Sequence, residues 1–171
     1  MNIIIYLISI MIVGGLHILY QYGSLETLLF MLKPVTLIVQ WFLGTAFIYH
    51  REIGFVSSQY QINIGRACAG INFFVTVYLM LVFSFIQRMK DKKSKAWAAV
   101  LFLLSSYGIT ILANASRIIG AVFIMNTGVF LDEKQAKLMH QSIGIIFYVT
   151  FLMLAYVLFS KLINNWGDSR E

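Results

Sequence analysis

The chain has 171 residues, of which 60% are hydrophobic and 12% are charged, with a formal charge of +6. A soluble domain carries about a quarter charged residues, so this composition excludes an ordinary soluble protein and predicts an integral membrane protein. One cysteine excludes an intramolecular disulfide and a cysteine-rich metal site. The basic residues gather in a short loop between apolar runs, which is typical of a cytoplasmic membrane loop and not of a nucleic-acid-binding surface.

The first part of the chain contains two predicted membrane spans. Residues 3–20 form an apolar run close to the length of about 20 residues that a spanning helix needs. The run has neither the basic region nor the cleavage site of a signal peptide, so we expect it to be a retained membrane helix. A polar patch and a short amphipathic turn end at Pro34, which suits the first turn of a helix. We therefore expect the second span over residues 35–49.

A polar stretch over residues 50–66 precedes the cysteine. Within it, Tyr60, Ile62 and Ile64 alternate with polar residues, which is the period of a half-exposed strand. Strand backbone cannot face lipid, so this segment is expected outside the hydrocarbon or inside protein. It leads directly to Cys68.

The third and fourth spans are predicted over residues 70–87 and 96–113, on either side of the loop 88–95. This loop holds five basic residues and one acidic residue, so the positive-inside rule makes it cytoplasmic. Its lysines would suit anionic lipid, although a simple topology signal is the more ordinary explanation. Counting spans from this loop predicts an outer amino terminus and an outer Cys68.

The last part of the chain contains one short apolar segment and one full span. Residues 118–131 are too short for an ordinary span and predict a re-entrant or interfacial element, whereas residues 141–162 are long enough to cross. The predicted fold is an all-α polytopic membrane protein, with about five transmembrane helices, that short element and a small strand-like segment before the cysteine. We expect a single membrane domain over residues 1–171.

Three side chains that are unusual in lipid are predicted at the same depth: Cys68, Arg117 and His140. A thiolate is a nucleophile, and a nearby histidine can take its proton and later protonate a leaving amine. A guanidinium stabilises an oxyanion or holds a carboxylate. Asn114 lies one helical turn before Arg117, on the same face, and would orient it.

Each of these residues also has an ordinary structural explanation. A lone cysteine is most often a small buried hydrophobe, and an arginine near a helix end often extends to the interface. Two other classes therefore stay open. One is a non-catalytic membrane subunit of a transport or envelope-polysaccharide system; the other is a haem-binding cytochrome subunit that uses two of the three histidines, His17, His50 and His140.

Three further residues are candidates for substrate binding or support. Arg66 would engage substrate beside the cysteine, unless it is a plain interface charge. Tyr60 would offer a strand edge to an extended peptide. Gly70 would allow close backbone approach beside Cys68. No metal site is expected.

The motifs around these residues resemble those of a known family. Ala67-Cys68-Ala69-Gly70-Ile71 resembles the Cys-Ser-Gly-Ile-type motif of the exosortase/archaeosortase family. Asn114-Ala115-Ser116-Arg117-Ile118 resembles its Asn-x-x-Arg-Ile motif, and His140-Gln141-Ser142-Ile143-Gly144 resembles its His-x-x-x-Gly motif. The resemblance covers roughly residues 55–160 and is closest to the compact exosortase K type. Ala69 departs from the family's common serine.

The resemblance implies a membrane-embedded cysteine transpeptidase at the outer face of the bacterial cytoplasmic membrane. Its substrates would be membrane-anchored surface-protein precursors that end in a short motif, a transmembrane helix and a basic tail. The enzyme would cleave near the motif and pass the protein to an unidentified acceptor nucleophile. Cys68 would be the nucleophile, His140 the acid/base and Arg117 the electrostatic stabiliser. No cofactor is implied, and no nucleic acid.

Overall fold

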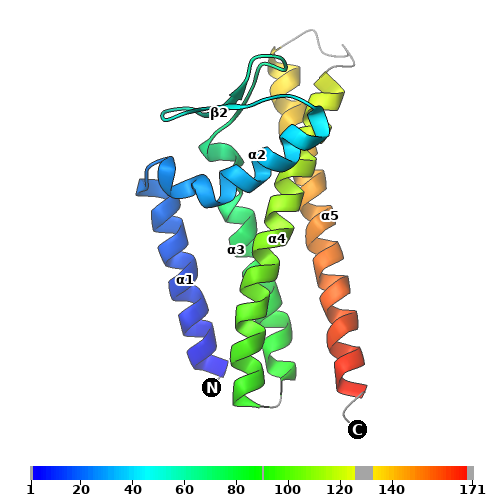
Figure 1. Ribbon diagram of the computed structural model, residues 1–171. Helices are drawn as coiled ribbons and strands as arrows, with labels where there is room; N and C mark the ends of the chain where they lie inside the picture. The colour runs from blue at the N-terminus through cyan, green and yellow to red at the C-terminus, as the bar shows by residue number, and fades with distance from the viewer. Residues whose placement is uncertain (1, 90, 126–132, 169–171) are drawn as a thin grey trace. The chain divides into compact units, whose positions relative to one another are not determined.

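The computed structural model describes all residues except 1, 90, 126–132 and 169–171, and it leaves out the side chains of residues 133–137, 139–140 and 166–168. Five α-helices dominate it (Figure 1): α1 Asn2–Tyr22, α2 Leu29–Leu43, α3 Ile71–Phe85, α4 Lys92–Met125 and α5 Glu133–Asp168. The segments that contain them are long and apolar enough to cross a membrane, so the chain is a multi-pass membrane protein. This confirms the predicted fold class.

The chain divides into two compact units, and α4 and α5 contribute to both. The first unit comprises Met1–Gln21, Ile71–Thr110 and Thr150–Glu171. The second unit comprises Tyr22–Gly70 and Ile111–Val149. Each unit is described separately below.

In the first unit, α1 runs antiparallel to α3. The hydroxyl groups of Ser9 and Tyr78 are hydrogen-bonded at 3.0 Å, and the Tyr6 and Phe83 rings lie 4.9 Å apart. Position 6 therefore lies beside position 83, and the later position 9 lies beside the earlier position 78. It follows that the end of α1 and the start of α3 lie at the same end of this unit.

Polar contacts hold the other end of the first unit together. Lys95 Nζ donates a hydrogen bond to Asn2 Oδ1 at 2.7 Å, and Arg88 donates one to Asn164 Oδ1 at 3.0 Å. The amino terminus therefore lies on the same side as the 88–95 loop, and the prediction that it lies on the opposite side is wrong. The reason is that residues 23–70 leave α1 and enter α3 at one end, so they make no net crossing of the membrane.

In the second unit, α2 begins earlier and ends earlier than the predicted span over 35–49. It starts at Leu29, directly after a 3-10 turn over Glu26–Leu28, so Pro34 lies inside the helix and not at its start. Gly44 ends it in the left-handed conformation at φ 63°, where its N–H donates to the Gln40 carbonyl at 3.0 Å. A glycine thus stops the helix before Tyr49, which lies in a strand.

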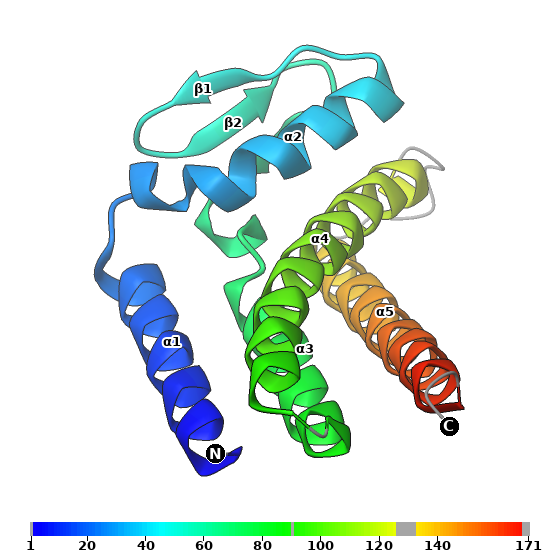
Figure 2. The same cartoon turned by 60° about the horizontal axis from the view of Figure 1, so that its bottom comes forward.

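A three-stranded antiparallel sheet follows α2 and confirms the strand-like segment before the cysteine. Its strands are β1 Ile48–His50, β2 Gly54–Ser57 and β3 Ile62–Ile64, in the order β1-β2-β3. Figure 2 shows β1 and β2 beside α2. Just after the end of α2, the hydroxyl group of Thr45 is hydrogen-bonded to that of Ser57 in β2 at 3.1 Å. Tyr60 lies in the turn before β3, so the prediction that it forms part of the strand is wrong.

Helix α4 continues past the predicted boundary at residue 113. Its 34 residues extend for about 51 Å without a break, so Arg117 lies within the helix and not at its end. Gly120 does not interrupt it, because this glycine makes room for a neighbour: a Cβ there would lie 2.9 Å from the Phe147 ring of α5. Residues 118–125 are thus helix and not a separate element, whereas residues 126–131 lie outside the described chain.

Helix α5 also begins earlier than predicted, at Glu133 rather than at residue 141.

Candidate functional site

Cys68 lies in the chain between β3 and α3. It ends a 3-10 turn over Arg66–Cys68, in which its N–H donates to the Gly65 carbonyl at 2.8 Å. Gly70 then adopts φ 67°, a left-handed conformation that favours glycine, and α3 begins at Ile71. The residue is buried, with 9% of its surface exposed, and its thiol is free. The 3-10 turn before Cys68 and the start of α3 after it therefore fix the position of this residue.

Asn114 connects Cys68 to the parts of α4 and α5 that belong to the second unit. Its side chain is fully buried on α4. Its Nδ2 donates to the Cys68 carbonyl at 3.2 Å, and its Oδ1 accepts a hydrogen bond from the Tyr148 hydroxyl of α5 at 2.5 Å. Both polar atoms of this amide are therefore satisfied, which fixes its orientation. The Cys68 turn, α4 and α5 are joined through one side chain.

Arg117 lies one helical turn after Asn114 and packs against the same part of α5. Its guanidinium carbon lies 5.5 Å from the centre of the Tyr148 ring, which is within cation–π range. A Cβ at Gly144 would lie only 3.3 Å from Arg117 Cδ, so the glycine leaves space for this side chain. Arg117 Nε is buried without a hydrogen-bond partner in the described part of the chain. A charged side chain is thus held on an aromatic ring, with one buried donor unpaired among the described residues.

The backbone of His140 belongs to α5, but its side chain lies outside the described residues. Helical spacing nevertheless relates this position to the site. Residues 140, 144 and 148 recur at intervals of four and therefore share one face of the helix. Gly144 and Tyr148 mark that face as the one against Arg117.

The other predicted site residues make structural contacts in the second unit. The Arg66 guanidinium donates to the Gly23 carbonyl at 2.5 Å, and the Tyr60 hydroxyl donates to the Leu43 carbonyl at 3.4 Å. These bonds tie the chain before Cys68 to the segment that carries α2. Gly70 serves the turn through its positive φ. Across the described residues, no group of three histidine, cysteine or acidic side chains could hold a metal ion.

Tyr148 is the residue that the sequence analysis missed. It contacts both Asn114 and Arg117, which makes it as central as either of them. The signal was present in the spacing. Gly144 follows His140 by four residues in the His-x-x-x-Gly motif, and Tyr148 follows Gly144 by another four. Among nine tyrosines in an apolar chain, nothing but that register distinguished it.

Comparison with protein families places these residues in context. The family model for transmembrane exosortases matches residues 4–157, which is most of the chain and more than the motifs alone covered. The protein belongs to the transmembrane exosortase family. A comparison with curated proteins and another with solved structures both find no match. Membership in the exosortase family implies a cysteine peptidase or transpeptidase that acts in the membrane on a membrane-anchored substrate.

Proposed function

We propose that this exosortase-family protein is a cysteine transpeptidase that cleaves the carboxy-terminal sorting signal of membrane-anchored surface-protein precursors. Cys68 is the nucleophile, Arg117 stabilises developing negative charge, and His140 is the acid/base. The observation that carries the proposal is the bridge made by Asn114, which attaches the Cys68 turn to the helix face that presents Arg117. Asn114 and Tyr148 act as positioning residues, and Arg66, Tyr60 and Gly70 support the segment before the nucleophile.

The chemistry divides into two acyl transfers. The Cys68 thiolate attacks the carbonyl carbon of the scissile peptide bond, and negative charge develops on the carbonyl oxygen beside Arg117. The carbon–nitrogen bond then breaks, and the departing nitrogen takes a proton from His140, which leaves a thioester on Cys68. An acceptor nucleophile gives its proton to His140 and displaces the thiolate. Water in place of the acceptor would give hydrolysis, and neither route needs a cofactor.

The geometry of α4 supports a site at the membrane surface opposite the basic loop. Arg117 follows Lys95 by 22 residues, which is about 33 Å along a helix and close to the roughly 30 Å thickness of the hydrocarbon core. With the 88–95 loop on the cytoplasmic side, the site faces the outside of the bacterial cytoplasmic membrane. A precursor anchored by its own transmembrane helix presents its cleavage motif at the same depth.

The test is processing of a co-expressed precursor that carries a motif, a transmembrane helix and a basic tail, chosen from the source genome. Cys68→Ala and Cys68→Ser should both abolish cleavage, whereas Ser116→Ala, a neighbour of Arg117, should process normally. All variants should elute as folded, membrane-extracted protein, because the Asn114 bond uses the carbonyl of residue 68 and not its side chain. Processing that persists in either Cys68 variant would exclude the thiol as the nucleophile.

A further inference from the structure

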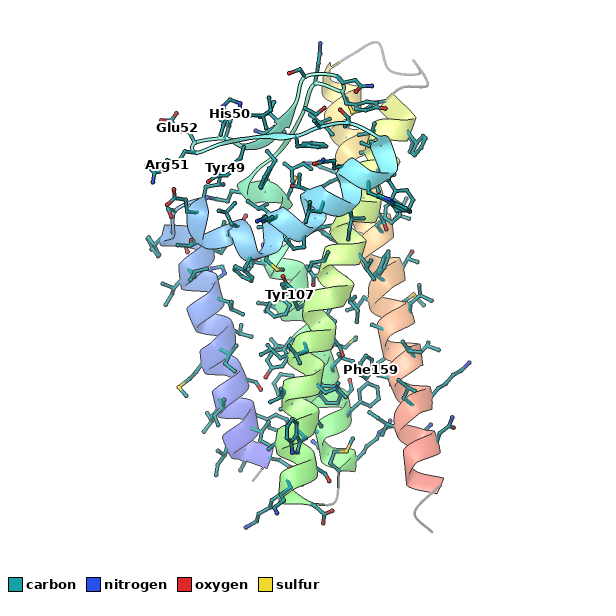
Figure 3. All side chains as sticks on the ribbon, viewed as in Figure 1. Tyr49, His50, Arg51, Glu52, Tyr107 and Phe159 are labelled. Carbon is teal, nitrogen blue, oxygen red and sulfur yellow. The ribbon has the colours of Figure 1, made fainter. Side chains whose placement is uncertain are left out.

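A cavity of about 680 Å³ lies in the first unit between the start of α4 and the later part of α5. This volume is within the roughly 300–1,000 Å³ typical of ligand pockets. Its inner wall includes the Phe102 and Phe159 rings, whose centres lie 5.6 Å apart. Figure 3 labels Phe159, which projects from α5 toward α4. The cavity is unrelated to the cysteine site, because every residue that lines it belongs to the first unit.

The cavity has the length of an acyl chain within one leaflet. Along α4 it extends from Lys93 to Phe102, nine residues that rise by about 14 Å. One leaflet contributes about half of the roughly 30 Å hydrocarbon thickness. The walls are apolar apart from Lys93 and Ser94. Trp97, which also lines the cavity, is 75% exposed and suits the boundary between headgroups and hydrocarbon.

The polar end of the cavity is basic. Lys93 lines it and is exposed, and Arg88 is fixed nearby by its hydrogen bond to Asn164, the residue after the lining residue Ile163. The Arg88 guanidinium also lies 5.2 Å from the centre of the Phe85 ring. Asp91 is the only acidic residue between positions 88 and 95 in the sequence. The cavity thus joins an apolar interior to a positively charged mouth.

We propose that this cavity binds an anionic phospholipid, with an acyl chain in the apolar interior and the phosphate at Lys93. The charge at the mouth selects an anionic headgroup over a zwitterionic one. It also disfavours a transmembrane segment with basic flanking residues, because like charges would then be brought together. The site lies at the 88–95 end of the first unit and does not depend on the catalytic proposal.

The test uses the fluorescence of Trp97 in vesicles. Trp41→Phe and Trp166→Phe leave Trp97 as the only tryptophan of the chain. Brominated phosphatidylglycerol or brominated phosphatidylcholine is then titrated at equal mole fraction into unbrominated phosphatidylcholine. We expect quenching that corresponds to about fivefold tighter association of the anionic lipid, as one basic contact near the surface provides.

The matched variants are Lys93→Gln and Lys92→Gln, which remove the same charge from adjacent positions. Only Lys93 lines the cavity, so Lys93→Gln should abolish most of the preference and Lys92→Gln should retain it. Equal quenching by the two lipids would overturn the proposal. So would an equal loss in both variants, which would indicate general attraction to the loop. Absence of quenching by either lipid would also overturn it, since a protein segment would then cover the cavity.

Discussion

The hydroxyl of Tyr148 lies 2.5 Å from the side-chain oxygen of Asn114, and the nitrogen of the same amide donates to the Cys68 carbonyl. A tyrosine on α5 therefore sets the orientation of the group that holds the turn bearing the thiol. The same ring lies against the Arg117 guanidinium. One aromatic side chain thus couples the proposed nucleophile to the proposed stabilising charge.

Tyr148→Phe tests this coupling. The ring stays against Arg117, but Asn114 Oδ1 is left buried without its donor, which costs about 1–3 kcal/mol. We expect kcat for precursor cleavage to fall about tenfold with KM changed less than twofold. Alkylation of Cys68, the only cysteine, should also change in rate. Tyr156→Phe is the control, since its ring packs on Phe85 in the first unit and its activity should be that of the unmodified protein.

Arg117→Lys tests whether the guanidinium has a specific role. A lysine keeps the charge but loses the planar group that stacks on Tyr148 and offers a fixed Nε donor. We expect kcat to fall about 100-fold or more, the usual effect of removing an oxyanion donor. Arg88→Lys, the same change at a residue of the first unit, should leave kcat unaltered. Comparable loss in both variants would point to a general effect on membrane insertion.

Gly144→Ala separates activity from stability. The added Cβ would lie 3.3 Å from Arg117 Cδ and push that side chain by a few tenths of an ångström. We expect kcat to fall about threefold to tenfold, while the helix gains up to about 1 kcal/mol from losing a glycine. Gly108→Ala in α4 is the matched control, because a Cβ there meets nothing within 4 Å. Gly108→Ala should be more stable than the unmodified protein and equally active. If both variants lose activity, or neither does, the steric argument is wrong.

Gly70→Ala should strain the connection between Cys68 and α3. The left-handed φ of 67° costs an alanine about 1–2 kcal/mol, whereas asparagine adopts this conformation more readily. We expect Gly70→Ala to lower both the melting temperature and the rate of cleavage, and Gly70→Asn to recover a large part of each. Differential scanning fluorimetry and the precursor assay measure the two effects. If asparagine is as harmful as alanine, close packing and not φ sets the requirement.

The position of the amino terminus can be tested by labelling in a Cys68→Ala background. A cysteine in a tag before Met1 and one introduced by Ser94→Cys should react with a membrane-impermeant maleimide only after permeabilisation. Ser24→Cys, just beyond the far end of α1, should react in intact cells. The Lys95–Asn2 hydrogen bond requires the first two sites to agree. Labelling of the tag and position 94 from opposite sides would contradict the arrangement of α1.

The composition predicted a membrane protein, because lipid requires long apolar runs that can be recognised in the sequence. The period of two in residues 59–64 predicted the strand-like segment. Helix ends were less predictable. Pro34 suggested a helix start, yet the preceding 3-10 turn supplies an earlier one. Gly120 suggested a break, yet it accommodates the Phe147 ring, which is a tertiary contact that spacing alone does not indicate. The direction of α1 depended on a span count, which the return of residues 23–70 to the same end made wrong.

For the site, the motifs named Cys68, Asn114 and Arg117, and the structure shows how the first two are joined. The bond goes to a backbone carbonyl, so no side-chain pattern could have predicted it. Tyr148 lay beyond the last recognised motif position. Its role follows only from the packing of α5 against α4. That packing places the Tyr148 hydroxyl on Asn114 and the Tyr148 ring against Arg117.

Asn114 bonds to the main-chain carbonyl of residue 68, so this hydrogen bond does not depend on the side chain at that position. An alanine variant therefore keeps the fold around the turn and removes only the thiol that we propose as the nucleophile. Such a variant should retain an intact precursor long enough for the pair to be purified together, so that the recognised motif can be identified by imaging the captured complex.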